Sequence, residues 1–562
     1  MASVQITIDG ITGSVPPGST VLEAARSLGV DIPTLCDHPA IQPIGACRIC
    51  LIEVEKQRGL QPACTFPVNE GMVVHTKSPK VVDARRFVLQ LLFSERNHFC
   101  MFCQASGSCE LQDLAYEYGL DHWEYDRAFP QMPVDASRKY FTMDHNRCIL
   151  CRRCIRACDE LVGNGTLGLK YRGAETRVIA DMDVPFGDST CVACGTCLQV
   201  CPVGAVLDRM SAYMGATDEV DRVKSRCTAC SVGCGLELVV RDNRVIRVEG
   251  DWDAEPNKGL LCELGRFGLM YDKRKRVNKP LVKTESGWVE TTWEDALGQV
   301  QQKLSGAGDA LCTVVSGLAS TEAAQAVMEK LPGTKAVMDG GMPAAADGIG
   351  VLDEADLFIV VQTDLTKDYQ VAGFAVKRSV RHRGARLMIL DDAQNGLEQL
   401  AVWKGTPEDA AHVLAVAQDA QMPVIIYDAA GAEIAKKLVD LLPNAKQVTF
   451  PGGSNAHGLA SVGLDTSFTA NGANAYYVLA AEAGQPDEKL MDALQKADYV
   501  VVQSSFREPW LDVAQVILPS PTAYEKNGTF ITAEGCKVEV AAGVSSKLLS
   551  EVEVIERIAA GL

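Results

Sequence analysis

Two stretches of the sequence repeat one cysteine pattern: CILCRRCIRAC at residues 148–158 and CVACGTCLQVCP at residues 191–202. Both runs have the spacing C-x2-C-x2-C-x3-C, and Pro202 follows the second. The cysteines of the repeat are Cys148, Cys151, Cys154 and Cys158, then Cys191, Cys194, Cys197 and Cys201. Thiolates at such short offsets can converge on one centre, and this spacing predicts two [4Fe-4S] cubes.

The repeat resembles that of bacterial two-cluster ferredoxins, in which each run gives three ligands to its own cube and the fourth to the other. The resemblance implies two ligand sets: Cys148, Cys151, Cys154 with Cys201, and Cys191, Cys194, Cys197 with Cys158. A pair of zinc fingers is the alternative, but it would not reproduce the trailing Cys-Pro. The first run is crowded by arginines, which either offset the negative charge of the clusters or form a solvated basic face. These are Arg147, Arg152, Arg153 and Arg156.

The other cysteines are also grouped, since 19 of the 21 lie between Cys36 and Cys262. The first group is spaced C-x10-C-x2-C-x13-C and comprises Cys36, Cys47, Cys50 and Cys64. Before it, residues 4–10, 11–15 and 20–28 predict two strands and a helix. Four thiolates on such a loop predict a [2Fe-2S] centre, with a four-thiolate zinc site as the alternative.

This first group resembles the amino-terminal ferredoxin domain of the large iron-sulfur subunit of respiratory complex I. Related subunits of NAD-linked hydrogenases and formate dehydrogenases share it. The resemblance implies a relay of electrons through several iron-sulfur centres in a multi-subunit complex.

The next group offers only three thiolates, from Cys100, Cys103 and Cys109. A [4Fe-4S] cube needs four ligands, and His98, two residues before the first cysteine, is the expected donor. A solvated histidine beside a three-cysteine zinc site is the alternative. Complex I subunits place their histidine four residues ahead of that cysteine, where this chain has Arg96. The His-x-Cys spacing is similar to that of relay subunits of bidirectional NAD-linked hydrogenases.

The last group is spaced C-x2-C-x3-C-x27-C and comprises Cys227, Cys230, Cys234 and Cys262. It resembles the amino-terminal [4Fe-4S] motif of molybdenum and tungsten bis-pterin enzymes. Leu264 stands where that family has a lysine between cluster and pterin, and leucine can neither donate a hydrogen bond nor carry charge. Cys312 lies in a strand-like run and is expected in the core, and Cys536 lacks the histidine and arginine neighbours of a catalytic cysteine. We expect a degenerate pterin domain without bound molybdopterin.

These motifs predict an α/β multidomain chain. Residues 1–80 are expected to form a β-grasp-like [2Fe-2S] ferredoxin domain, 81–138 the His98 and three-cysteine [4Fe-4S] segment, and 139–218 a two-[4Fe-4S] ferredoxin domain. Residues 219–280 are expected to hold the last [4Fe-4S] group. In residues 281–562, apolar runs such as ALCTVVSG, EADLFIVVQ and MPVIIYD predict buried parallel strands in a degenerate doubly wound domain. Residues 347–350, DGIG, lack the third glycine of a nucleotide-binding loop and are expected to form a plain loop.

The composition and the absence of certain motifs exclude several classes of function. The 54 basic and 72 acidic side chains give a net charge of −18, which disfavours nucleic acid as a partner. The first residues show no export signal and no apolar run is long enough to span a bilayer, so a cytoplasmic protein without membrane insertion is expected. The eight histidines include no acid-base constellation, and no flavin or NAD site is expected on this chain.

The leading hypothesis is a non-catalytic electron-relay subunit of an NAD(P)-linked oxidoreductase with one [2Fe-2S] and four [4Fe-4S] centres. The expected partners are a flavin and NAD(P)-binding subunit, a thioredoxin-like [2Fe-2S] subunit, and a hydrogenase or formate dehydrogenase catalytic subunit. Ferredoxin would join them if the complex bifurcates electrons. Three alternatives remain open: a peripheral-arm subunit of complex I that feeds quinone reduction, a catalytic Mo/W-pterin formate dehydrogenase, and a zinc-bound scaffold.

Overall fold

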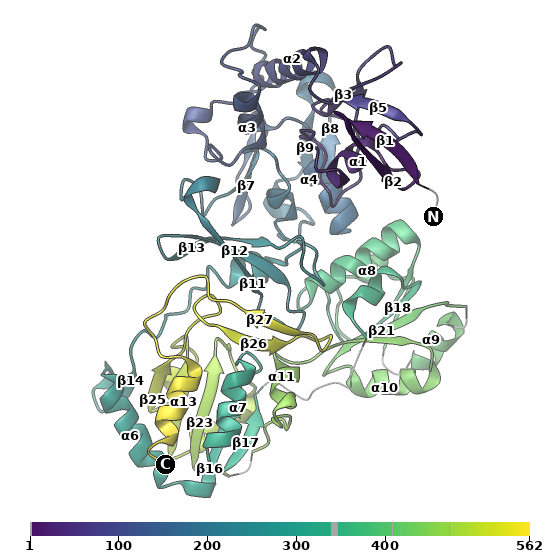
Figure 1. Cartoon of the computed structure of the whole chain (residues 1–562). Coiled ribbons are helices and arrows are strands. Elements are labelled where there is room, and N and C mark those ends of the chain that lie inside the picture. Colours follow the sequence, from purple (N-terminus) through teal and green to yellow (C-terminus); the bar gives the residue numbers. More distant parts are fainter. Residues whose placement is uncertain (1–2, 339–346, 407–408, 418, 471) are drawn as a thin grey trace. The chain divides into compact units, whose positions relative to one another are not determined.

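The computed structural model describes residues 3–338, 347–406, 409–417, 419–470 and 472–562. Contacts divide the chain into two compact units, Met1–Val220 and Asp221–Leu562. Their elements are labelled in Figure 1. Among the described residues, none of the helices has the length and apolar character that crossing a bilayer requires.

The first unit begins with a five-stranded sheet whose strand order is β2-β1-β5-β3-β4. The strands are β1 (Val4–Ile8), β2 (Ile11–Val15), β3 (Leu51–Val54), β4 (Gln61–Pro62) and β5 (Met72–His75). Helix α1 (Val21–Ser27) follows the first hairpin, because Thr20 and Glu23 form a reciprocal capping box at its start. The strand-strand-helix order expected from the sequence is confirmed. The loop between α1 and β3 carries the first cysteines.

The rest of the first unit has short elements between the cysteine runs. Its helices are α2 (Pro79–Glu95), α3 (Glu110–Glu117), α4 (Arg153–Arg156) and α5 (Thr196–Gln199). A three-stranded sheet joins β6 (Val134–Asp135), β7 (Phe141–Asp144) and β10 (Val206–Asp208), and β8 (Leu167–Lys170) pairs with β9 (Arg177–Ala180). One hydrophobic cluster in this unit contains thiols from four of the cysteine groups: Cys36, Cys47, Cys100, Cys109, Cys148, Cys151 and Cys201. The cysteine groups are therefore packed against one another and not spread over the surface.

The second unit starts with an antiparallel sheet of β11 (Asp221–Arg226), β12 (Gly235–Arg241) and β13 (Arg244–Gly250). Two larger sheets follow. The seven-stranded one has the order β15-β14-β25-β24-β23-β16-β17, and the five-stranded one has the order β20-β19-β18-β21-β22. The α/β character expected for this half is confirmed, but the strands that were expected in one doubly wound domain are divided between two sheets.

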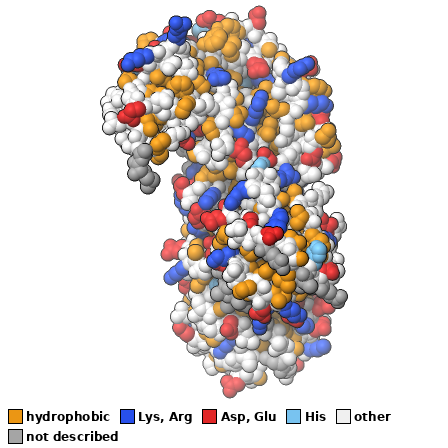
Figure 2. All heavy atoms as spheres, turned by 90° about the vertical axis from the view of Figure 1, so that its right-hand side faces the viewer, with side chains coloured by type: hydrophobic (Ala, Val, Ile, Leu, Met, Phe, Trp, Pro, Cys, Tyr) orange, Lys and Arg blue, Asp and Glu red, His pale blue; other side chains and the backbone are white. Residues whose placement is uncertain are grey.

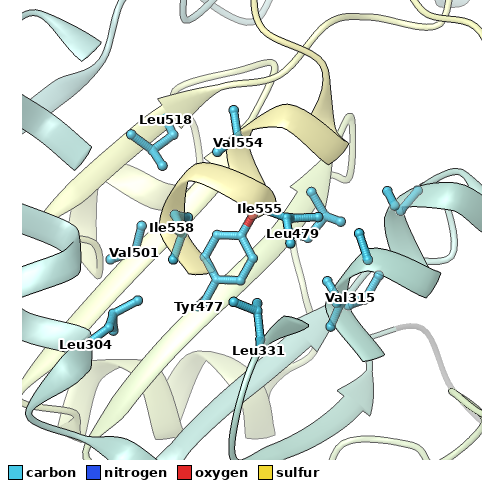
Figure 3. Packing of buried hydrophobic residues seen from close by; sticks show 14 of the residues in the cluster. Leu304, Val315, Leu331, Tyr477, Leu479, Val501, Leu518, Val554, Ile555 and Ile558 are labelled. Atoms are coloured by element: carbon cyan, nitrogen blue, oxygen red, sulfur yellow. The ribbon is translucent and has the colours of Figure 1, made fainter. Parts of the chain in front are cut away.

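The seven-stranded sheet contains β14 (Leu281–Thr284), β15 (Gly287–Glu290), β16 (Leu311–Val315), β17 (Thr334–Val337), β23 (Ala475–Ala481), β24 (Tyr499–Ser504) and β25 (Val516–Pro519). Helices α6 (Trp293–Ser305), α7 (Thr321–Lys330), α12 (Glu488–Lys496) and α13 (Glu551–Ala559) belong to this part of the chain. Buried side chains of α13, such as Val554, Ile555 and Ile558, pack around Tyr477 of the central strand (Figure 3). Cys312, in β16, is 1% exposed, so its expected core position is confirmed.

The five-stranded sheet is entirely parallel. It contains β18 (Leu357–Val361), β19 (Arg386–Leu390), β20 (Trp403–Gly405), β21 (Pro423–Asp428) and β22 (Lys446–Phe450). Helix α8 (Gln370–Arg383) and helix α10 (Ala432–Leu441) lie on opposite sides of it, and α9 (Ala410–Ala417) belongs to the same part (Figure 1). Helix α11 (Ala456–Ser461) contacts α7 instead, and its Leu459 belongs to the core of the seven-stranded sheet. The strand order reverses between β18 and β21, as it does between β16 and β23 in the seven-stranded sheet, so the parallel strands of both sheets are doubly wound. Near the carboxyl terminus, β26 (Gly528–Ile531) pairs with β27 (Lys537–Val540).

Two further features concern residues 347–350 and the distribution of charge on the surface. Residues 347–350 were expected to form a plain loop, but a short 3-10 helix, Ile349–Asp353, begins within them. Basic and acidic side chains are interspersed over the face shown in Figure 2, so no field of one sign covers that face.

Candidate metal centres

His98 and three cysteines line one cavity. The cavity has about 320 Å³ of empty space, and its walls include Cys100, Cys103 and Cys109. The Nε2 atom of His98 is buried and has no hydrogen-bond partner among the described residues. Burial, together with Arg147 and Arg96, lowers the pKa of His98 to about 4, which keeps the imidazole neutral. A neutral, unpartnered nitrogen beside three thiols fits a fourth iron ligand.

The local chain explains how this cavity forms. Helix α2 ends at Arg96, whose buried guanidinium donates to the carbonyls of Thr176 (2.9 Å) and Ala174 (3.4 Å). Arg96 therefore has a structural role at the position where complex I subunits have their histidine. Cys109 directly precedes α3, so free backbone N–H groups at the start of that helix can donate to its thiolate. A Cβ on Gly204 would lie 3.0 Å from the Cys103 Sγ, so glycine leaves room for the ligand set.

The two ferredoxin-like runs cross in the way the resemblance implied. Cys158 of the first run lines a cavity of about 340 Å³ together with Cys191, Cys194 and Cys197 of the second run. Cys201 of the second run lies in the same hydrophobic cluster as Cys148 and Cys151 of the first run. Because it is close, its thiolate charge adds to the effect of burial in raising the pKa values of Cys148, Cys151 and Cys154. Burial raises these pKa values further, so bare thiolates together are unfavourable without a compensating cationic core. Both ligand sets are spatially assembled, and their binding of iron remains a prediction.

The arginines beside the first run do not form a solvated face, and that expectation was wrong for two of them. Arg153 is 3% exposed and Arg156 is 8% exposed. Arg153 donates both of its terminal nitrogens to the Glu110 carboxylate, at 2.6 and 2.8 Å. Arg147 pairs with Asp144 at 3.0 Å, and only Arg152 is exposed. Sequence spacing could not reveal this burial, because the acceptors come from segments far away along the chain.

The amino-terminal cysteines also converge. Cys36 contacts Cys47 and Cys64, and Cys50 contacts Cys64, through thiol hydrogen bonds. These bonds hold the pKa of Cys36 and that of Cys50 below their usual values. Cys36, Cys50 and Cys64 are each at most 1% exposed. Four thiols in mutual reach inside a protein core fit a binuclear centre.

In the second unit, Cys227, Cys230, Cys234 and Cys262 line a cavity with about 320 Å³ of empty space. The backbone N–H of Gly265 donates to the Cys262 Sγ at 3.2 Å. A Cβ on Gly265 would lie 3.1 Å from the Cys227 Sγ, so only glycine leaves the sulfur unobstructed there. Leu264 is 50% exposed, and its side chain supplies no donor.

The residues that line the rest of this cavity were not predicted from the sequence. They include Asp368, Tyr369, Gln370 and Val371, at the start of α8. The Tyr369 ring stacks on Phe450, with ring centroids 4.1 Å apart. Burial raises the pKa of Asp368, and the carboxylates of Asp364 and Asp428 raise it further. The position of these residues after β18 was the only signal available, because ligand sites in doubly wound sheets lie beyond the carboxyl ends of strands.

A zinc interpretation fits these cavities less well. Four thiolates around zinc bind at about 2.3 Å, which draws the sulfurs close together. Within the described ranges, no group of three or more His, Cys, Asp or Glu side chains has the geometry to hold one metal ion.

Comparison with protein families assigns every cysteine group to an iron-sulfur region. Residues 1–79 match a 2Fe-2S iron-sulfur cluster binding domain, 85–123 the NADH-ubiquinone oxidoreductase-G iron-sulfur binding region, and 147–205 a 4Fe-4S dicluster domain. Residues 220–272 match the molybdopterin oxidoreductase Fe4S4 domain and 276–550 molybdopterin oxidoreductase. The fold and these matches thus define a chain with [2Fe-2S]- and [4Fe-4S]-binding domains ahead of a molybdopterin-oxidoreductase-type α/β domain.

Individual proteins that are similar to this chain have names consistent with these family matches. The chain is 31% identical to a G-type NADH-quinone oxidoreductase subunit of Rhizobium meliloti over 70% of its own length and 48% of the relative's. It is 28% identical to NADH-quinone oxidoreductase subunit 3 of Thermus thermophilus over 95% of its length and 79% of the relative's. It is 30% identical to NADPH-Fe(3+) oxidoreductase subunit alpha of Geobacter sulfurreducens over 75% of its length and 49% of the relative's. The chain is thus a homologue of G-type subunits of NADH-quinone oxidoreductase and of formate dehydrogenase-like proteins.

The chain spans about half the length of the Rhizobium and Geobacter relatives. One solved structure, an NAD+-reducing [NiFe]-hydrogenase in the H2-reduced state, has a chain that is 37% identical, with a TM-score of 0.36. The match covers 38% of this chain and 91% of that one.

Proposed function

We propose that this chain is the electron-relay subunit of an NAD(P)H-linked oxidoreductase complex and holds one [2Fe-2S] and four [4Fe-4S] centres. It would carry electrons between a flavin-containing NAD(P) subunit and a second redox subunit of hydrogenase or formate dehydrogenase type. A thioredoxin-like [2Fe-2S] subunit would accompany the flavin subunit, and ferredoxin would take part if the complex bifurcates electrons.

The observation that carries the proposal is the His98 cavity. An imidazole with a buried, unpartnered Nε2 lines the same space as three thiols. This donor set completes a fourfold ligand shell that thiols alone would leave one short. The spacing that places His98 there resembles that of hydrogenase-linked relay subunits.

The packing of the first unit supports conduction through the protein. Thiols of the [2Fe-2S], His98 and first ferredoxin groups belong to one hydrophobic cluster. A dry, shared core excludes water from the space between the proposed centres, and burial and hydrogen bonding are the means by which a protein tunes their potentials.

The pterin domain does not fit a catalytic role. Leu264 offers neither charge nor a hydrogen bond beside Cys262. Cys312 is buried inside β16, and Cys536, although exposed, lies beside β27 without a histidine or arginine neighbour in sequence. We therefore assign no molybdopterin to this chain, and no reaction step at a pterin.

The test is metal analysis of the full chain, purified and reconstituted without oxygen. We expect about 18 iron atoms per chain with matching inorganic sulfide, no stoichiometric molybdenum or tungsten, and no extractable pterin. Reduction should give electron paramagnetic resonance (EPR) signals of both centre types. Zinc in place of sulfide would refute the relay function, and stoichiometric molybdenum or tungsten with pterin would favour a catalytic subunit.

A second candidate is a complex I peripheral-arm subunit that feeds quinone reduction, which the names of the Rhizobium and Thermus relatives favour. Purification from the native source with its partners distinguishes the two. Co-elution of a hydrogenase or formate dehydrogenase subunit would support the first candidate, and co-elution of quinone-reducing membrane subunits would support the second.

A further inference from the structure

We propose that Arg156 is a positioning residue that fixes the proposed [2Fe-2S] loop to the ferredoxin helix and raises the potential of the [2Fe-2S] centre. This inference rests on the proposed function, because it requires iron-sulfur centres at Cys36 and at the ferredoxin runs.

Arg156 lies at the junction of three proposed ligands. It ends α4, two residues after Cys154 and two before Cys158, which belong to different proposed cubes. Its Nη2 donates to the backbone carbonyl of Cys36, a proposed [2Fe-2S] ligand, and its Nη1 donates to the carbonyl of Gln42. One planar guanidinium thus joins the amino-terminal loop to the helix that serves both cubes.

A second contact shows that the loop is held from two sides. The backbone N–H of Gln42 donates to the Glu160 carboxylate at 2.7 Å. Arg156 and Glu160 are four residues apart on one helical stretch, formed by α4 and the π-helical turn Ala157–Leu161, and Cys158 lies between them. Both backbone groups of Gln42 are therefore bound by the segment that carries the ferredoxin ligands, which fixes the register of loop and helix.

Arg156 and its neighbour Arg153 carry the same charge, but only the charge of Arg153 has a counter-ion. Arg153 is neutralised by the bidentate Glu110 carboxylate. Arg156 is 8% exposed, yet its acceptors are carbonyls, and it forms no ion pair within the part of the chain that the structure describes. A buried cation without a counter-ion is costly, and a cluster held by four thiolates is an anion that would compensate it. Since reduction adds negative charge to that cluster, a fixed cation beside it favours the reduced state.

The matched control is Arg152. It stands in the same run, carries the same charge and is exposed to solvent, where water screens it. Arg156→Gln and Arg152→Gln remove the same charge, one from the buried junction and one from the surface. Arg156→Lys keeps the charge but loses the two-pronged fork that spans the carbonyls of Cys36 and Gln42.

The experiment is an anaerobic redox titration of the reconstituted full chain followed by EPR, with iron and sulfide assayed in every sample. At the wild-type midpoint, Arg156→Gln should lower the ratio of reduced to oxidised [2Fe-2S] about tenfold, equivalent to about 59 mV for one electron. Arg152→Gln should change that ratio less than about twofold. Arg156→Lys should keep the ratio but weaken the magnetic coupling between the reduced [2Fe-2S] centre and its neighbouring cube.

The outcomes separate the two proposals. A wild-type chain without iron and sulfide would refute the proposed function and this inference with it. A loaded chain whose Arg156→Gln and Arg152→Gln titrations coincide would overturn the role of Arg156 alone. If Arg156→Gln fails to load iron, Arg156→Lys decides: wild-type magnetic coupling in that variant would overturn the positioning role, and weakened coupling at an unchanged potential would support it.

Discussion

Replacing His98 by cysteine should lower the reduction potential of one [4Fe-4S] centre. The change exchanges a neutral imidazole for a thiolate, which adds one negative charge to the ligand shell. The cavity already contains Cys100, Cys103 and Cys109, so the variant would present four thiols. The extra charge opposes the arrival of the electron, and reduction should need a more negative potential.

The size of the shift follows from the burial of the site. The His98 Nε2 is shielded from water, so an effective dielectric constant of about 20 is appropriate in place of 80. A unit charge about 4 Å from the added electron then contributes about 4 kcal/mol, on the order of 170 mV for one electron. Arg96 and Arg147, which help to lower the pKa of His98, should offset part of this, leaving a drop on the order of 100 mV.

The assay is an EPR-monitored redox titration of His98→Cys, with His122→Cys as control. His122 is an exposed histidine in the same unit that contacts Asp121, and its replacement adds a thiol away from the cavity. We expect one cube to shift in the first variant and none in the second. If every cube in His98→Cys titrates as in the wild type, and His98→Ala also keeps all its signals, His98 is not a ligand and the interpretation of this cavity is wrong.

Two further changes test the second unit. Gly265→Ala would bring a Cβ to 3.1 Å from the Cys227 Sγ, and we expect the loss of one cube, about four iron atoms per chain, by iron assay. Lys526→Met would leave Glu551 without its ion-pair partner, 3.4 Å away, where both side chains are at most 5% exposed. The free energy of unfolding should fall by about 3–5 kcal/mol in urea denaturation.

Each of these changes has a control within the chain. Gly298→Ala adds a Cβ in α6 where nothing lies within 4 Å, so its iron content should equal that of the wild type. Lys330→Met breaks an ion pair with Glu556 whose side chains are 39% and 48% exposed, and it should cost about 0–1 kcal/mol. Equal iron in the two glycine variants, or equal losses in the two lysine variants, would contradict the respective argument.

Local signals in the sequence predicted several of the elements and a set of iron ligands, and the ligand set stays a prediction. The Thr20 and Glu23 box is readable because both partners lie within one helical turn. The runs around Cys148 and Cys191 are readable because several ligands of one cube lie within a few residues of each other. His98 is readable because it stands two residues from Cys100.

Burial and long-range contacts could not be predicted from the sequence in the same way. In the sequence, Arg153 and Arg156 look like part of a solvated basic face, yet both are buried. Their acceptors, Glu110 and the carbonyl of Cys36, lie 43 and 120 residues away along the chain, so the sequence spacing gave no sign of these contacts. The split into two sheets depends on which strands pair, and apolar runs of similar length do not encode their partners.

The sequence by itself predicted which side chains can hold iron, since cysteine spacing is a local property, and where helix α1 starts, since its capping residues lie within one turn. Only the tertiary structure decided that Tyr369 and Asp368 line the last cavity together with its thiols, and that Arg156 joins two cysteine loops. These contacts depend on how segments far apart along the chain pack together, and that packing is set by burial of the whole core.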